Sequence, residues 1–359
     1  MKNDIKLLIA DDSKVMREAI SEMFSNGSNI QVVAEATNGL EAVEAAAVYK
    51  PDVITMDVAM PVMDGITALK HIMINTPTPT LMLSSLTLEG ARVAFDALRF
   101  GAVDFISKPS ALNDTALREQ EAEIRSKIEY VEAVELDAIK YIREIPITQS
   151  HFSEINEGQK PSRVVAMGTS EGGYGALLKI IPHLSADVPF SYLVTMYATR
   201  ENVDAFASYL NQFSHVHIKR ATHNEFLKPG VCYLSSGMDY MTVHHQVDDY
   251  LLHVSPAPFA SRKGAIDMLL FSCAEVVAED CIAVVLSGSG SDGAEGVGEV
   301  LRLGGHAITQ DQATALYKNM PTTAHDQGPG SIYVADKDIA SSINDIYMKN
   351  GSDNPPGVG

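Results

Sequence analysis

The chain has 359 residues, of which 46% are hydrophobic and 20% charged, and its formal net charge is −19. This length predicts two domains or a little more, and the composition is ordinary for a folded protein. A chain this acidic repels phosphate backbones and anionic lipid, so we expect it to bind no nucleic acid. No apolar run approaches membrane-spanning length, which predicts no membrane insertion.

The three cysteines, Cys232, Cys273 and Cys281, have no metal-type spacing. We expect them to be buried thiols in a reducing compartment. The chain passes from Lys2 and Asp4 directly into a strand pattern, without a basic and then apolar leader. These features predict a cytoplasmic protein.

Short apolar runs alternate with amphipathic stretches over residues 5–108. This alternation predicts parallel βαβ units and a doubly wound α/β sheet that is covered on both faces. The predicted strands are Ile5–Ala10, Ile30–Glu35, Val53–Met56, Thr80–Ser84 and Ala102–Ile106, and the predicted helices include Ser13–Phe24, Gly39–Val48 and Gly65–Asn75.

Polar residues follow the strands at the edge where such a sheet binds ligands. Asp11 and Asp12 come after the first strand, and Asp57 ends the third. Converging carboxylates repel one another unless a cation lies between them, and oxygen ligands suit Mg²⁺. Asp57 would then attack a phosphoryl group, while Ser84 and Lys108, at the ends of the fourth and fifth strands, would contact its oxygens.

A simpler interpretation makes Asp11 and Asp12 the N-cap of the following helix and Lys108 a surface residue. The complete set of residues at matched strand ends favours the phosphoryl site.

Residues 5–110 resemble the response-regulator receiver family of two-component signalling. The resemblance implies a flavodoxin-like receiver domain over 1–112, with Asp57 as phospho-acceptor and a chemotaxis-type sensor histidine kinase as partner. It also implies that Phe105 carries an aromatic ring that turns inward on phosphorylation, although plain core packing is compatible with this. The matching stretches are Leu-Leu-Ile-Ala-Asp-Asp-Ser at 7–13, Asp-Val-Ala-Met-Pro-Val-Met-Asp-Gly at 57–65, Ser-Ser at 84–85 and Phe-Ile-Ser-Lys-Pro at 105–109.

Apolar residues at helical spacing over 115–145 predict a long amphipathic helix, and residues 146–162 read as linker. Together they form the expected connection, 113–162. A second alternating segment follows over 163–348, and a disordered tail is predicted over 349–359. Its predicted strands are Arg163–Met167, Phe190–Met196, Val231–Leu234, Ile282–Ser287 and His306–Gln310, with helices such as Gly175–Ile181 and Gly293–Leu303 and a hairpin around Tyr233–His253.

Two glycine-rich loops in this segment each end a strand and open a helix. In Gly168-Thr169-Ser170-Glu171-Gly172, the glycines permit a sharp turn that exposes the Ser170 hydroxyl at a helix N-terminus. The other loop, at 286–293, offers backbone N–H groups and the carboxylate of Asp292. The first loop could equally bind an anion or only connect strand and helix, and Asp292 could be a helix N-cap.

The second segment resembles the catalytic domain of the chemotaxis protein-glutamate methylesterases. The loops at 168–173 and 286–296, the Asn-Met-Pro at 319–321 and the domain order all match. The resemblance implies a Rossmann-like domain with a hairpin insertion, Ser170 as nucleophile, Asp292 as acid and chemoreceptors as partners. It implies removal of methyl esters from receptor glutamates and deamidation of glutamines. From the domain order, we expect the receiver to mask this site until Asp57 is phosphorylated.

The resemblance implies that the catalytic histidine of that family should lie within residues 194–198, where this sequence has Tyr197. Ser235–Tyr240 and Lys263–Asp267 depart from the family pattern as well. A tyrosine has a reference pKa of about 10, so only about one molecule in a thousand is phenolate at pH 7. A serine triad that loses its histidine can lose about a millionfold in rate.

Three functional hypotheses follow from the sequence. The first is a receiver-gated hydrolase, in which another histidine could replace the missing base. The second is a catalytically degenerate pseudoenzyme that acts as a phosphorylation-switched binding module. The third gives Ser170 different chemistry, with Tyr197 as an acid or oxyanion donor.

Overall fold

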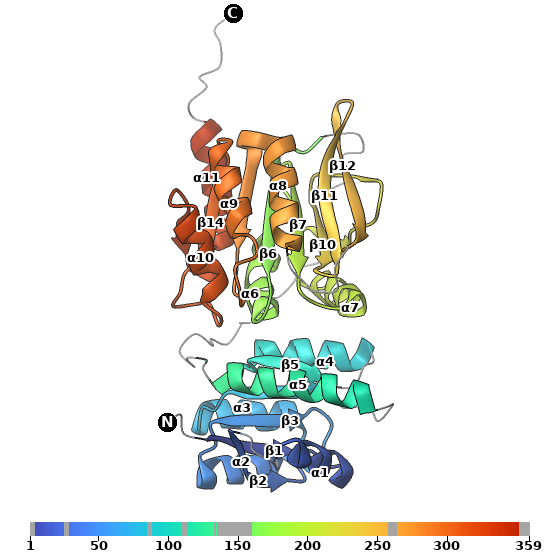
Figure 1. The fold of residues 1–359 in the computed structure, drawn as a ribbon, viewed down its shortest axis with the longest axis vertical. Coiled ribbons are helices and arrows are strands. Elements are labelled where there is room, and N and C mark those ends of the chain that lie inside the picture. The colour runs from blue at the N-terminus through green and yellow to red at the C-terminus, as the bar shows by residue number, and fades with distance from the viewer. Residues whose placement is uncertain are drawn as a thin grey trace, which may run out of the picture. The chain divides into compact units, whose positions relative to one another are not determined.

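The computed structural model describes residues 4–24, 29–84, 88–108, 114–132, 134, 160–257 and 264–351. The chain forms two compact units, Met1–Arg143 and Glu144–Gly359, which Figure 1 distinguishes by colour along the chain. None of the helices in these described ranges combines the length and the apolar character that crossing a membrane requires.

The first unit is built on a five-stranded parallel sheet in the order β2-β1-β3-β4-β5. This confirms the predicted doubly wound α/β fold. The last strand begins two residues later than predicted, after Ala102 and Val103. The strands are β1 (Ile5–Ala10), β2 (Ile30–Ala36), β3 (Val53–Asp57), β4 (Thr80–Ser84) and β5 (Asp104–Ser107).

Polar caps begin several helices of this unit, as at Asn38, whose side chain accepts from the N–H of Glu41, and at Asp64, which accepts from that of Thr67. The long amphipathic helix contacts β3 and β4 and ends at Glu132. Residues 135–145 of the predicted helix and residues 146–159 of the predicted linker lie outside the described ranges. The helices are α1 (Lys14–Met23), α2 (Gly39–Tyr49), α3 (Gly65–Asn75), α4 (Leu88–Arg99) and α5 (Asp114–Glu132).

The second unit has a seven-stranded parallel sheet in the order β15-β14-β13-β6-β7-β10-β8. The five predicted strands are all present, and β8 and β15 extend the two edges. The strands are β6 (Arg163–Thr169), β7 (Phe190–Met196), β8 (His217–Arg220), β10 (Val231–Ser236), β13 (Cys281–Val285), β14 (His306–Gln310) and β15 (Ile332–Val334).

Helix α8 has an apolar face that packs against β6, α9 and β11. Its buried residues include Ile266, Leu270 and Cys273, so it joins the main sheet to the hairpin. The helices are α6 (Gly173–Ile180), α7 (Arg200–Leu210), α8 (Ala265–Val277), α9 (Ala294–Arg302), α10 (Asn319–Gln327) and α11 (Ile339–Gly351), with 3-10 helices at Ile181–His183, Ala278–Asp280 and Asp336–Asp338. The prediction of a disordered tail over 349–359 was wrong for residues 349–351, which belong to α11, and the rest of that tail lies outside the described residues.

The predicted hairpin is confirmed, and it forms a separate three-stranded sheet beside α8 (Figure 1). It consists of β11 (Asp239–Gln246) and β12 (Asp249–Pro256), with β9 (Glu225–Phe226) at one edge. The prediction that it starts near Tyr233 was wrong. Tyr233 lies in β10, whose six residues are all buried, as in a central parallel strand, whereas β11 alternates between buried and more exposed positions.

Candidate functional sites

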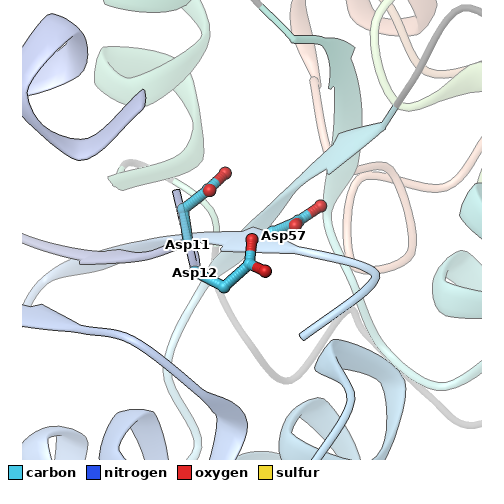
Figure 2. A group of neighbouring side chains, drawn as sticks. All are labelled: Asp11, Asp12 and Asp57. Atoms are coloured by element: carbon cyan, nitrogen blue, oxygen red, sulfur yellow. The ribbon is translucent and has the colours of Figure 1, made fainter. Parts of the chain in front are cut away.

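Three carboxylates meet where β1 and β3 end (Figure 2). Asp11, Asp12 and Asp57 each have an oxygen within 4.8 Å of the others. Asp11 and Asp57 are buried, and Asp12 is exposed. The arrangement follows from the sheet register, since Ala10 pairs with Met56 and the next residue of each strand carries the acid.

Two local features hold these acids in place. The backbone N–H of Ser13 donates to Oδ1 of Asp11 at 2.8 Å, which fixes the carboxylate at the start of α1. On the other side, a Cβ at Gly65 would lie 1.9 Å from the backbone oxygen of Asp57. Glycine is therefore the residue that lets α3 begin so close to the predicted phospho-acceptor.

Lys108 supplies the positive charge of this site. Its Nζ lies 2.7 Å from Oδ2 of Asp57 and 3.0 Å from Oδ2 of Asp11. Burial raises the pKa of Asp57, and the charge of Asp11 adds to this, although Lys108 acts in the opposite direction. Burial lowers the pKa of Lys108, but its hydrogen bonds to the two carboxylates outweigh that effect and raise it overall.

The acid cluster fits a magnesium ion. Three carboxylate oxygens lie close together, and oxygen is the ligand type that Mg²⁺ takes. Two of the carboxylates are buried, so a cation would offset the electrostatic cost that raises the pKa of Asp57.

The two remaining predicted residues of this unit lie on β4 and β5. Ser84 ends β4, the strand beside Asp57, but its side chain is outside the described part of the structure. Phe105 is buried on β5, and its ring meets Phe95 edge to face with the centroids 5.6 Å apart. Lys127 on α5 donates to the Phe105 carbonyl at 2.8 Å, which ties this strand to the helix.

In the second unit, Ser170 lies at a sharp turn between β6 and α6. Gly172 adopts a left-handed conformation (φ 75°), and a Cβ there would lie 2.6 Å from Oγ of Ser287. The N–H of Ser170 donates to the Ser287 carbonyl at 3.1 Å. A Cβ at Gly288 would approach Ser170 Oγ to 2.4 Å, so this glycine makes room for the hydroxyl.

The Ser170 hydroxyl is held by its chain neighbour, Glu171. Ser170 Oγ lies 2.6 Å from Glu171 Oε2, and it accepts a hydrogen bond from the N–H of Ser289 at 3.0 Å. Burial acts to raise the pKa of Glu171, but the hydrogen bonds from Ser170 and Ser289 lower it overall. Glu171 was not predicted from the sequence as a site residue, although its position directly after the predicted nucleophile indicates one.

The structure brings Tyr197 to Asp292. The tyrosine hydroxyl donates to Asp292 Oδ2, and the Tyr197 ring lies against Gly237, where a Cβ would be 2.4 Å away. Burial raises the pKa of Tyr197, and the hydrogen bond to Asp292 raises it further. Tyr197 is therefore a neutral hydrogen-bond donor.

Asp292 also caps a helix, as the simpler interpretation predicted, but the helix is α8. Its Oδ2 and Oδ1 accept from the N–H groups of Ile266 and Asp267 at 3.0 and 2.9 Å. In return, Asp267 Oδ1 accepts from the N–H of Gly296 in α9 at 2.8 Å. Burial and the charge of Asp292 raise the pKa of Asp267 to about 6.

The described histidines do not contact Ser170. Its hydroxyl contacts, within the ranges that the structure describes, are Glu171, Ser289 and Met320. His253 on β12 lies between the rings of two other histidines, with centroid distances of 4.1 and 5.0 Å. His325 stacks on the ring of Tyr333.

Each of the two units matches a known protein family. Residues 165–343 match the CheB methylesterase family, and residues 7–119 match the response regulator receiver domain. The protein-glutamate methylesterase/protein-glutamine glutaminase 2 of Carboxydothermus hydrogenoformans is 33% identical over 350 residues, which cover 94% of this chain and 98% of that protein. The protein-glutamate methylesterase/protein-glutamine glutaminase of Archaeoglobus fulgidus is 36% identical over 327 residues, with 90% and 93% covered.

Among solved structures, the response regulator domain of Thermotoga maritima CheB is 46% identical. It covers 36% of this chain and 98% of its own, with a TM-score of 0.34.

Proposed function

The chain belongs to the CheB methylesterase family, and we propose that it hydrolyses glutamyl methyl esters of chemoreceptors, with Ser170 as the nucleophile. It is a chemotaxis-type response regulator that joins a receiver domain to a methylesterase domain. Its relatives are also named as glutaminases, and the same nucleophile would serve an amide of the same side chain. The degenerate, binding-only alternative receives no support from these relatives.

The observation that carries this proposal is the setting of the Ser170 hydroxyl. It lies at the carboxyl end of β6, where α6 begins, between a carboxylate and the N–H of Ser289. Ser170 Oγ would attack the ester carbonyl carbon, and the N–H of Ser289 would donate to the oxyanion that forms. The N–H of Ser289 would exchange its present hydrogen bonds to Ser170 and Glu171 for one to this oxyanion.

In the receiver domain, we propose that Asp57 takes the phosphoryl group. Its carboxylate is the nucleophile, and Lys108, 2.7 Å away, would neutralise the transferred group. Asp11, Asp12 and Asp57 would hold Mg²⁺, which neutralises phosphoryl charge when bound. Ser84 and Phe105 remain the proposed residues of the phosphoryl switch.

The proposed partners are a chemotaxis-type sensor histidine kinase, which would supply the phosphoryl group, and methyl-accepting chemoreceptors, which would be the substrate. The protein would meet both in the cytoplasm. Its three cysteines are buried thiols, as expected in a reducing compartment.

Methanol release from methylated chemoreceptor fragments tests the enzymatic proposal. The full chain would be treated with Mg²⁺ and a small-molecule phosphodonor, beside Ser170→Ala and Tyr197→His variants. We expect release from the parent and none from Ser170→Ala. Release that persists in Ser170→Ala would show that another group is the nucleophile, and no release from the folded parent would contradict the proposal. A faster Tyr197→His variant would show that a histidine at this position improves the same site.

A further inference from the structure

We propose that Glu171 is the general base that activates Ser170. This inference rests on the proposed function, because it assigns a proton acceptor to the same nucleophile. It makes Glu171 a catalytic residue, since its carboxylate contacts the attacking oxygen.

The geometry places one oxygen of Glu171 at the centre of the site. Glu171 Oε2 accepts hydrogen bonds from Ser170 Oγ at 2.6 Å, from Ser289 Oγ at 2.7 Å and from the N–H of Ser289 at 3.1 Å. The backbone carbonyl of Glu171 accepts from Ser287 Oγ at 2.9 Å, which fixes the residue to the neighbouring loop. Within the described ranges, Glu171 is the one ionisable group that is hydrogen-bonded to the Ser170 hydroxyl.

Tyr197 cannot fill this role. Its hydroxyl proton points to Asp292, so the oxygen is engaged as a donor. Its pKa lies above the ordinary value of 10, so fewer than about one molecule in a thousand carries a phenolate at pH 7. Glu171, by contrast, is ionised throughout the neutral range.

A carboxylate is a weaker general base than an imidazole. With a pKa below the ordinary value of 4.5, it accepts a proton less readily than an imidazole with a pKa of about 6.5. A general base works best when its pKa is near the working pH. We therefore expect a slow enzyme that keeps its activity in mild acid, where a histidine-dependent esterase loses it.

The proton balance of the reaction is complete with Glu171 alone. As Ser170 Oγ bonds to the ester carbon, its proton moves to Glu171, and the protonated acid then gives that proton to the departing methoxide, which leaves as methanol. In the second half, Glu171 takes a proton from water as the water attacks the acyl-enzyme. That proton returns to Ser170 Oγ when the glutamate product leaves.

The test is the rate at which a fluorophosphonate probe labels Ser170 in the full chain, read by mass spectrometry. Labelling requires an activated serine but no receptor. It therefore tests the role of Glu171 independently of the proposed substrate. Glu171→Gln keeps the size and an acceptor oxygen while removing the charge, and we expect labelling to fall by about 10²–10⁴-fold. Glu295→Gln, an exposed change of the same charge in α9, should label like the parent.

Two further measurements distinguish a general base from a residue that only maintains the structure of the site. Glu171→Gly should recover part of its labelling rate when formate is added, because a free carboxylate can enter the vacated space. The parent rate should change by less than about twofold between about pH 5.5 and pH 8. The profile should be repeated with Asp267→Asn, since Asp267 titrates near pH 6, whereas Ser170 and Ser289, which bind the Glu171 carboxylate, are uncharged.

The outcomes separate the two proposals. Normal or faster labelling in Glu171→Gln, no labelling of the folded parent, or an acidic limb near pH 6.5 that persists in Asp267→Asn would each overturn the base role. Glu171-dependent labelling without methanol release from receptor fragments would keep the base and reject the proposed substrate.

Discussion

In both candidate sites of this chain, neighbouring carboxylates repel one another, and different groups stabilise them in each site. Each gathers carboxylates at the carboxyl ends of parallel strands. In the receiver, the ammonium of Lys108 lies 2.7 and 3.0 Å from Asp57 and Asp11. In the methylesterase domain, Asp292 and Asp267 are held by backbone N–H groups at the first turns of α8 and α9.

This difference matches the chemistry that we propose for each site. A phosphoryl group brings permanent negative charge, which a lysine and a metal ion can neutralise. An ester is neutral and becomes an anion only during attack. A backbone donor, the N–H of Ser289, would then stabilise that anion, while other N–H groups hold Asp292 and Asp267. Sites at the carboxyl ends of parallel strands can therefore serve different reactions, according to the groups that stabilise negative charge there.

The largest expected effect is in the receiver. Asp57→Asn removes the nucleophilic carboxylate, so phosphorylation by a small-molecule phosphodonor with Mg²⁺ should disappear completely. Intact-mass spectrometry measures it, with the exposed Glu44→Gln in α2 as the charge-matched control. Undiminished phosphorylation of Asp57→Asn would show that another residue is the acceptor, and would contradict the assignment of the receiver site to Asp57.

In the methylesterase domain, the corresponding change is Gly288→Ala. The added Cβ would lie 2.4 Å from Ser170 Oγ and 2.6 Å from Met320 Cε, so it displaces the nucleophile. A displacement of about 1 Å can cost about 10²-fold in rate, and we expect probe labelling of Ser170 to fall by that order. Gly175→Ala in α6, where a Cβ meets nothing within 4 Å, is the matched control. Equal labelling of both variants would show that Ser170 does not depend on this close approach.

A third change tests how tightly the receiver site is built. A Cβ at Gly65 would lie 1.9 Å from the backbone oxygen of Asp57, so Gly65→Ala should destabilise the first unit by about 1–3 kcal/mol. Denaturant unfolding followed domain by domain measures it, and the transition of the second unit serves as the internal control. An unshifted first transition would mean that α3 can move away from Asp57 without cost.

The smallest expected effect concerns Asp267. Its pKa of about 6 in the folded chain exceeds its ordinary value of 3.8, so between about pH 4 and 6 the folded state binds more protons than the unfolded state, and stability falls as the pH rises. Asp267→Asn keeps an acceptor for Gly296 and removes this loss. After allowance for solvent screening, we expect the variant to be about 1 kcal/mol more stable than the parent at pH 7.

The measurement for Asp267→Asn is the free energy of unfolding against pH, with the exposed Asp326→Asn as control. The advantage of Asp267→Asn should shrink as the pH falls from about 6 to about 4. A variant that is less stable than the parent at pH 7 would show that the Asp267 charge stabilises α9 more than its burial costs.

Much of the fold was predictable because its signals are local. Buried apolar runs alternating with amphipathic helices indicated both parallel sheets, and the acids at the ends of β1 and β3 indicated the receiver site. The short edge strand Glu225–Phe226 gave no such signal, because two residues carry no period. The extent of the hairpin was misplaced for a related reason, since the buried run containing Tyr233 fits a central parallel strand as well as a hairpin strand.

The second site was only partly predictable because its contacts join distant loops. Ser170 and Asp292 were found from glycine-rich turns, and Tyr197 from its position. The hydrogen bond from Tyr197 to Asp292 and the capping of α8 by Asp292 depend on how three loops meet. Glu171 was not predictable as the base, because a serine nucleophile usually pairs with a histidine, whereas the structure places a carboxylate on the hydroxyl of Ser170.

We propose that Ser170 is a nucleophile whose reactivity is controlled by phosphorylation of Asp57. The most direct test is the rate of fluorophosphonate labelling of Ser170 in the full chain, with and without phosphodonor and Mg²⁺, in the parent and in Asp57→Asn. We expect that Ser170 is labelled in the parent, that phosphodonor speeds the labelling, and that Asp57→Asn removes the increase. A folded parent whose Ser170 is not labelled, or is labelled at one rate under all conditions, would contradict this proposal.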